Sequence, residues 1–173
     1  GSILIMLIGF SVGIHSTMIY VDDNTSGLII KKITGGDLKD GALVAINGEN
    51  GPQAKILPDG YHFGYWPWIY DLEIIKNINI EKGSVGVVTA KDGKPLPESE
   101  IFAPSWKSLK EMLDGETFLR SGYKGPQLTV LTPGSYRYNP RLYDIEIQPA
   151  LEIPVGSVGV IKSNVGEIFA PKA

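Results

Sequence analysis

An internal repeat constrains the fold of this chain more than any other feature. The stretch "GPQAKILPDGYHFGYWPWIYDLE" at residues 51–73 returns as "GPQLTVLTPGSYRYNPRLYDIE" at residues 125–146. Gly51 matches Gly125, an offset of 74 residues, and Tyr70 matches Tyr143, an offset of 73, so the second copy has lost one residue in between. The chain is therefore expected to fold as tandem copies of one small unit.

A second repeated block sets the limits of the unit. "EKGSVGVVTAKDG" at residues 81–93 becomes "PVGSVGVIKSNVG" at residues 154–166, and a degenerate version, "VDDNTSGLIIKK", places Gly27 where Gly86 and Gly159 stand. A unit that opens with the G-x-V-G-V strand and closes with the P-x-x-Y-D-x-E strand gives modules at residues 21–79 and 80–152. A third module begins at 153 and is incomplete at 173.

The local pattern within the modules is typical of β-structure. "YDIEIQ" and "YDLEI" alternate apolar and polar residues, which indicates strands with one buried face, and three glycine turns separate such runs: Pro58-Asp59-Gly60, Asp92-Gly93 and Pro133-Gly134. One short helix is predicted near residues 105–114, with Ser105 as its N-cap, Trp106, Leu109 and Leu113 on one face, and a stop at Asp114-Gly115. The predicted class is α+β, mainly β.

The N-terminal segment has a different composition. Residues 3–19, "ILIMLIGFSVGIHSTMI", contain no Asp, Glu, Lys or Arg, which predicts a transmembrane anchor over residues 1–20. The side chains expected in the bilayer are Ile3, Leu4, Ile5, Met6, Leu7, Ile8, Phe10, Val12, Ile14, Met18 and Ile19. A buried core segment and a cleaved signal peptide are the alternatives.

Charge near this segment bears on its orientation. Three lysines, Lys31, Lys32 and Lys39, follow within about 20 residues, which favours a cytoplasmic position for the remainder of a single-pass protein.

Composition argues against several kinds of chemistry. The net charge of −3 does not favour a nucleic-acid partner, and the absence of cysteine with only two histidines does not favour a metal site or a cofactor. "GFSVG" at residues 9–13 fits a nucleophile elbow, with Asp22 and His62 following in hydrolase order. Ser11 nevertheless lies in an unbroken apolar run, so no catalytic residue and no enzyme activity are expected.

The two copies differ most in one turn region. Copy one carries "YHFGYWPW" where copy two carries "SYRYNPR". Tryptophan and tyrosine favour the membrane–water interface, so an interfacial position is predicted for Tyr20, Tyr61, Phe63, Tyr65, Trp66 and Trp68. The alternatives are that these rings fill the core of copy one or line a ligand pocket.

These motifs together resemble a known family. "LPDGYHF", followed by Pro67 and a Y-D-x-E strand and preceded by "GLIIK" and an apolar N-terminal segment, resembles the opening of the SPFH or band 7 family (stomatin, prohibitin, flotillin, HflK/C). "FLRSGYKGPQLTVLTPGSYRYNP" and "IPVGSVGVIKSNVGE" are similar to the longer flotillin-like bacterial members. The chain departs from that family in lacking the rest of the third module and a long helical C-terminal region.

The resemblance implies a function without catalysis. It implies a membrane-anchored scaffold subunit of the bacterial cell membrane that assembles into a multi-copy ring or cage and organises a membrane microdomain. Its partners would be further copies of itself, the lipid bilayer, and a small membrane protein or a membrane protease. The alternatives are a vault-like shell repeat protein and a membrane-tethered β-rich ligand-binding module. Gly86 and Gly159 could open strand edges for assembly, or serve ordinary pairing within the chain.

Overall fold

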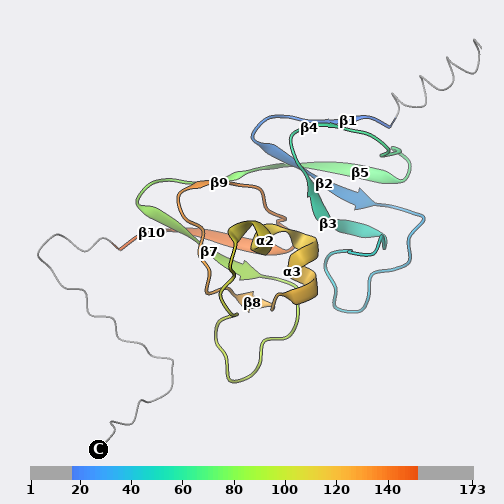
Figure 1. Cartoon of the computed structure of the whole chain (residues 1–173). Coiled ribbons are helices and arrows are strands. Elements are labelled where there is room, and N and C mark those ends of the chain that lie inside the picture. The colour runs from blue at the N-terminus through green and yellow to red at the C-terminus, as the bar shows by residue number, and fades with distance from the viewer. Residues whose placement is uncertain (1–16, 152–173) are drawn as a thin grey trace, which may run out of the picture.

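The computed structural model describes residues 17–151, and these fold into two modules with the same order of strands (Figure 1). The first module, residues 17–77, contains β1 (Ile19–Val21), β2 (Thr25–Lys31), β3 (Gly51–Leu57), β4 (Gly60–His62) and β5 (Tyr70–Lys76). The second module, residues 78–151, contains β6 (Ile78–Ile80), β7 (Ser84–Ala90), α2 (Leu109–Leu113), α3 (Gly115–Ser121), β8 (Gly125–Pro126), β9 (Gly134–Tyr136) and β10 (Tyr143–Pro149).

Each module has one three-stranded and one two-stranded antiparallel sheet. The strand orders are β3-β2-β5 with β1-β4 in the first module, and β8-β7-β10 with β6-β9 in the second. The central strand pairs in full register with the last strand in both: Thr25 faces Lys76 in the first module, and Ser84 faces Pro149 in the second. The repeated sequence therefore specifies the same topology twice.

A buried glycine lies in the central strand of each module. A Cβ atom on Gly27 would lie 2.8 Å from Leu72 Cδ1, and one on Gly86 would lie 3.1 Å from Leu131 Cβ, so glycine lets neighbouring strands pack closely. Gly86 and Leu131 also exchange backbone hydrogen bonds of 2.9 and 2.8 Å. The strand edge at Gly86 is thus used within the chain and is not open for assembly. Gly159 lies outside the described residues.

The hydrophobic core crosses the boundary between the modules. A large cluster around Phe118, Leu131 and Tyr143 includes Val44 and Ala54 of the first module. A smaller cluster of Val21, Ile29 and Leu57 lies within the first module alone. In Figure 1, α3 lies beside β3 at the boundary. The two modules are therefore joined by a shared core.

The helical region begins later than predicted. The N-cap of α2 is Ser108 rather than Ser105, and α3 starts at Gly115, directly after Asp114. The backbone N–H of Trp106 donates to Thr129 Oγ1 over 2.7 Å, which ties the residues before Ser108 to the segment after β8. Trp106, Leu109 and Leu113 do pack together against the large core cluster.

The expected membrane span is corrected by the structure. Ile19, its last residue, begins β1 and pairs with His62, and Thr17 is buried in a turn. Across residues 17–151, neither helix has the length and apolar character needed to cross a bilayer. The fold class is mainly β with two short helices, and the predicted transmembrane helix and single-pass localisation are not supported. The rest of the expected span, residues 3–16, lies outside the described residues.

Candidate functional site

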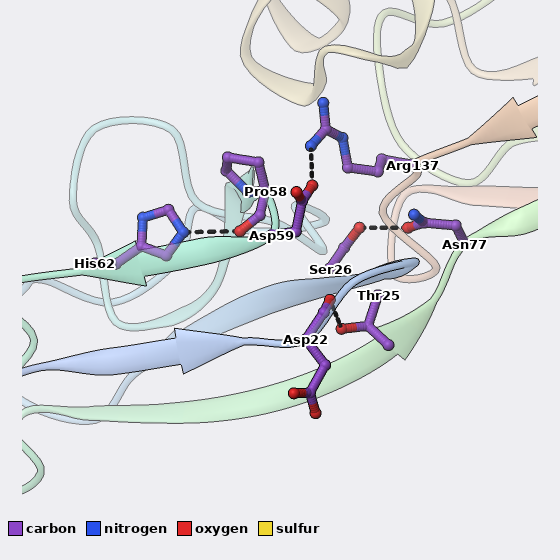
Figure 2. Close-up of polar contacts among 8 residues, drawn as sticks. All are labelled: Asp22, Thr25, Ser26, Pro58, Asp59, His62, Asn77 and Arg137. Carbon is purple, nitrogen blue, oxygen red and sulfur yellow. Dashed lines mark hydrogen bonds and ion pairs between the residues drawn. The ribbon is translucent and has the colours of Figure 1, made fainter.

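Polar side chains of the second module hold it against the first. Arg137, which directly follows β9, forms an ion pair with Asp59 over 3.1 Å, and Figure 2 shows these two side chains pointing toward one another. Arg141, which precedes β10, pairs with Glu73 of β5 over 3.0 Å. All four side chains are about half exposed, so each pair contributes little energy but helps to fix the relative position of the modules.

Asn139 is the buried centre of this contact. Its Nδ2 atom donates to the backbone carbonyls of Gln53 at 3.0 Å and Ala54 at 3.4 Å, and its Oδ1 accepts from the Arg141 N–H at 3.0 Å. Its exposed fraction is 0%. Because a buried polar group is costly without partners, the boundary is specific for an amide here. We call Arg137, Asn139 and Arg141 the inner docking set.

The linker between the modules forms a second polar contact. Ser26 Oγ donates to Asn77 Oδ1 over 2.6 Å (Figure 2), and the Asn77 N–H donates to the Asn24 carbonyl over 3.1 Å. The backbone bond recurs at the end of the second module, where the Ala150 N–H donates to the Gly83 carbonyl over 2.8 Å.

The repeated Gly-Pro-Gln motif has a defined structural role. The side-chain amide of Gln53 donates to the carbonyls of Glu49 and Gly51, and that of Gln127 donates to the carbonyls of Tyr123 and Gly125. Each glutamine therefore closes the turn at the start of the equivalent strand of its own module, which is β3 in the first module and β8 in the second. This equivalence supports residue-by-residue comparison of the modules.

The comparison places aromatic residues of the first module at the positions of the inner docking set. Phe63 directly follows β4 as Arg137 follows β9, while Trp66 and Trp68 stand where Asn139 and Arg141 stand. The exposed fraction is 59% for both Phe63 and Trp68, and the rings of Trp66 and Trp68 lie 4.8 Å apart between centroids. We call Phe63, Trp66 and Trp68 the aromatic outer face.

The surface that receives the docking set is altered in the second module. Leu128 and Pro133 stand where Ala54 and Asp59 stand, and Glu146 stands where Glu73 stands. Ala54 is 1% exposed beneath the second module, whereas Leu128 is 58% exposed. Phe102 and Val130 are also exposed here, and the Leu128 N–H donates to the carbonyl of Ala103, the neighbour of Phe102. We call Phe102, Leu128, Val130, Pro133 and Glu146 the apolar outer end.

The residues predicted for a membrane interface do not all lie on the surface. Tyr65 is half-buried, packs against the smaller core cluster and contacts Tyr70 edge-on. Its pKa is raised, mainly by burial and to a smaller extent by the neighbouring Tyr70. Tyr61 is 63% exposed and lies against Tyr20, whose pKa is raised mainly by the neighbouring Asp23 carboxylate. The core-filling alternative therefore describes Tyr65, whereas Tyr61, Phe63 and Trp68 face outward.

The hydrophobic residues expected in the bilayer divide between the described and undescribed parts of the chain. Met18 is exposed, and Ile19 packs against the smaller core cluster. The others lie outside the described residues: Ile3, Leu4, Ile5, Met6, Leu7, Ile8, Phe10, Val12 and Ile14.

The residues that fitted a hydrolase order make ordinary structural contacts. His62 Nε2 lies 2.7 Å from the Pro58 carbonyl oxygen, and the Asp22 carbonyl accepts a hydrogen bond from Thr25 Oγ1 (Figure 2). Ser11 lies outside the described residues. Within the part of the chain that the structure describes, no three His, Asp or Glu side chains are grouped as metal ligands would be.

A cavity at the module boundary is not lined by the aromatic residues of the first module that were predicted for a ligand pocket. It has a volume of about 500 Å³ and lies between the end of β3, α2 and β9, where Ile56, Leu109, Leu113 and Tyr136 contribute apolar walls and Lys55 and Lys110 lie among its lining residues. This cavity therefore does not support the ligand-pocket alternative, in which a cavity would be lined by Tyr61, Phe63, Tyr65, Trp66 and Trp68.

The chain matches no family model, no curated protein and no solved structure. The resemblance to SPFH proteins therefore stays a prediction.

The sequence did contain a signal for the inner docking set. Arg137, Asn139 and Arg141 lie where the two copies differ most. Neither copy alone shows which of its residues lies at a module boundary.

Proposed function

We propose that this chain is a scaffold subunit without a catalytic role, whose tandem β-modules assemble with further copies of the chain. The observation that carries the proposal is the exposure of two surfaces that correspond to the internal docking contact. The aromatic outer face, together with Leu128, Pro133 and Glu146 of the apolar outer end, occupies the positions that hold the two modules together inside the chain.

Physical reasoning supports an assembled state. Repeat modules bury their apolar surfaces against neighbouring modules, so an apolar surface on the outer side of a module favours a further contact. The outer side of the first module carries Phe63 and Trp68 and that of the second carries Phe102 and Leu128, each more than 40% exposed. Exposed apolar residues gathered in this way are typical of interaction sites.

The mass of the intact particle tests this proposal. The full chain is expected to form particles larger than a dimer by multi-angle light scattering in a mild detergent, and crosslinking is expected to give a ladder beyond the dimer. A monomer throughout a wide dilution series would contradict assembly.

A second use of the aromatic outer face is contact with lipid headgroups. The exposure of Tyr61, Phe63 and Trp68 favours it, because such rings partition to the membrane–water interface. It does not require a membrane span. Co-sedimentation with anionic and neutral liposomes, before and after Trp66→Asn with Trp68→Arg, tests it.

A further inference from the structure

The outer sides of the two described modules differ from the inner boundary in a matched way. At the inner boundary Arg137 meets Asp59; the equivalent positions at the outer ends are Phe63 and Pro133. An ion pair inside the chain thus corresponds to an aromatic ring at one end and a proline at the other. Both partners of the pair have lost their charge.

The buried centre of the boundary shows the same correspondence. Inside the chain the amide of Asn139 lies against the backbone of Ala54. The equivalent positions at the outer ends are Trp66 and Leu128. A small polar contact corresponds to two large apolar side chains, which would bury their surfaces if they met.

The third position retains an acceptor. Arg141 pairs with Glu73 inside the chain, and the equivalent positions are Trp68 and Glu146. The indole N–H of tryptophan donates hydrogen bonds. Trp68 could therefore donate to Glu146 where Arg141 donates to Glu73.

We propose that the aromatic outer face of one copy docks on the apolar outer end of a second copy, in the arrangement that the second module adopts on the first. This inference rests on the proposed function and names its interface. A lipid surface would account for the aromatic residues at Phe63, Trp66 and Trp68. It would not account for the matching apolar residues on the outer side of the second module, whereas docking between copies accounts for both.

The symmetry of this contact follows from its two different surfaces. Each copy offers one aromatic outer face and one apolar outer end, so the contact is heterologous. Successive copies continue in the same direction, and the assembly is a ring where the rotation closes and a filament where it does not.

Complementary blocked copies test the direction of the contact. Trp66→Asn with Trp68→Arg, which copies the second module, blocks the aromatic outer face, and Leu128→Glu blocks the apolar outer end. Because central aromatic residues dominate interfaces, each variant is expected to associate at least about 30-fold more weakly and to run as a monomer. Their equimolar mixture retains one intact face and one intact end, so it forms a dimer and nothing larger.

Exchange of one pair for its inner counterpart tests the register. Phe63→Arg alone and Pro133→Asp alone are each expected to weaken association, since either change replaces an apolar contact by an unpaired charge. Both changes in one chain are expected to recover part of it, because each contact then contains the ion pair seen between Arg137 and Asp59. Asp59 itself precedes a glycine in the equivalent turn, so aspartate is accepted there.

Controls separate docking from folding and from nonspecific association. All variants are compared in the same mild detergent, because residues 3–19 are apolar, and their melting temperatures should stay near that of the parent. Ile74→Asn is the matched control: Ile74 is 48% exposed, and its equivalent Ile147 is 51% exposed, so docking of a module leaves this position open. It should assemble like the parent.

The outcomes distinguish this interface from the broader proposal. If the parent assembles and both blocked variants assemble equally well, the head-to-tail interface is wrong while the scaffold function stands. If the parent is monomeric, both are wrong. Loss of liposome binding in the Trp66 and Trp68 variant of a monomeric parent would assign the aromatic outer face to lipid. One further pair of results would also overturn the interface. In it, deletion of residues 153–173 tightens association, and the equimolar mixture of the two blocked variants forms no mixed dimer.

Discussion

Replacing Asn139 by alanine should weaken the coupling between the two modules more than any other single polar change at the boundary. The substitution removes the hydrogen bonds to the Gln53 and Ala54 carbonyls and the one from the Arg141 N–H. A typical hydrogen bond contributes about 1 kcal/mol, and a buried group left without a partner costs about 1–3 kcal/mol. The long bond to Ala54 contributes least, so the free energy of unfolding is expected to fall by about 2–4 kcal/mol.

Chemical denaturation followed by two probes measures this effect. Tryptophan fluorescence and far-ultraviolet circular dichroism should coincide in the parent, because the shared core makes the modules unfold together. In Asn139→Ala the midpoint should fall, and a split between the two probes would indicate that the modules have begun to unfold separately. Asn79→Ala, at an exposed position of β6, is the control and should change stability by less than about 0.5 kcal/mol. If Asn139→Ala also changes the free energy of unfolding by less than about 0.5 kcal/mol, the reasoning is refuted.

Three further changes test other parts of the fold. Gly115→Ala would bring a Cβ atom into a steric clash with the Ala54 carbonyl oxygen, so we expect a loss of about 1–3 kcal/mol by denaturation; stability equal to the parent would show that α3 can move away from β3. Gln127→Leu removes both bonds that close the second Gly-Pro-Gln turn and the bond that Gln127 accepts from the Trp106 indole N–H, and it should cost about 1–3 kcal/mol; an unchanged midpoint would show that the backbone alone holds this turn. Burial raises the pKa of Tyr143 above its value in the unfolded chain, which is about 10. The stability that the neutral side chain provides is therefore complete below pH about 10 and is lost as the pH rises from there toward the folded pKa. Tyr143→Phe should therefore be less stable at neutral pH, since Tyr143 donates to the Met112 carbonyl, but should lose less further stability at alkaline pH; parallel pH profiles would contradict this.

Features of the fold that depend on near neighbours could be predicted from the sequence. The alternation in "YDIEIQ" and "YDLEI" places strands where β10 and β5 lie, because the pattern is a property of consecutive residues. The degree of burial was less predictable: Tyr143 is 1% exposed, but Ile147 on the same strand is 51% exposed. The core covers only one end of β10, and a local pattern does not reveal this.

Contacts between distant residues account for what the sequence did not reveal. Ile19, the last residue of the uncharged run at 3–19, fits the predicted span by composition, yet it pairs with His62, which lies in β4. Likewise, Ser105 is a good helix cap in isolation, but the neighbouring Trp106 is bonded to Thr129. In both cases tertiary pairing overrides the local preference.

Only part of the candidate site could be predicted from the sequence, because the rest depends on contacts between distant residues. Alignment of the copies showed that Trp66 and Trp68 replace Asn139 and Arg141. It could not show that Asn139 is bonded to the backbone of Gln53, a residue of the other copy. The functional meaning of the exchange depends on that contact.

The shared core also sets the order of events during synthesis. Val44 and Ala54 emerge from the ribosome early, but the residues that cover them, including Phe118 and Tyr143, are made much later. The first module therefore leaves the ribosome with part of its apolar surface uncovered, and its folding cannot be completed until β10 has been synthesised. A nascent chain stalled between the two copies would expose this surface to chaperones and proteases.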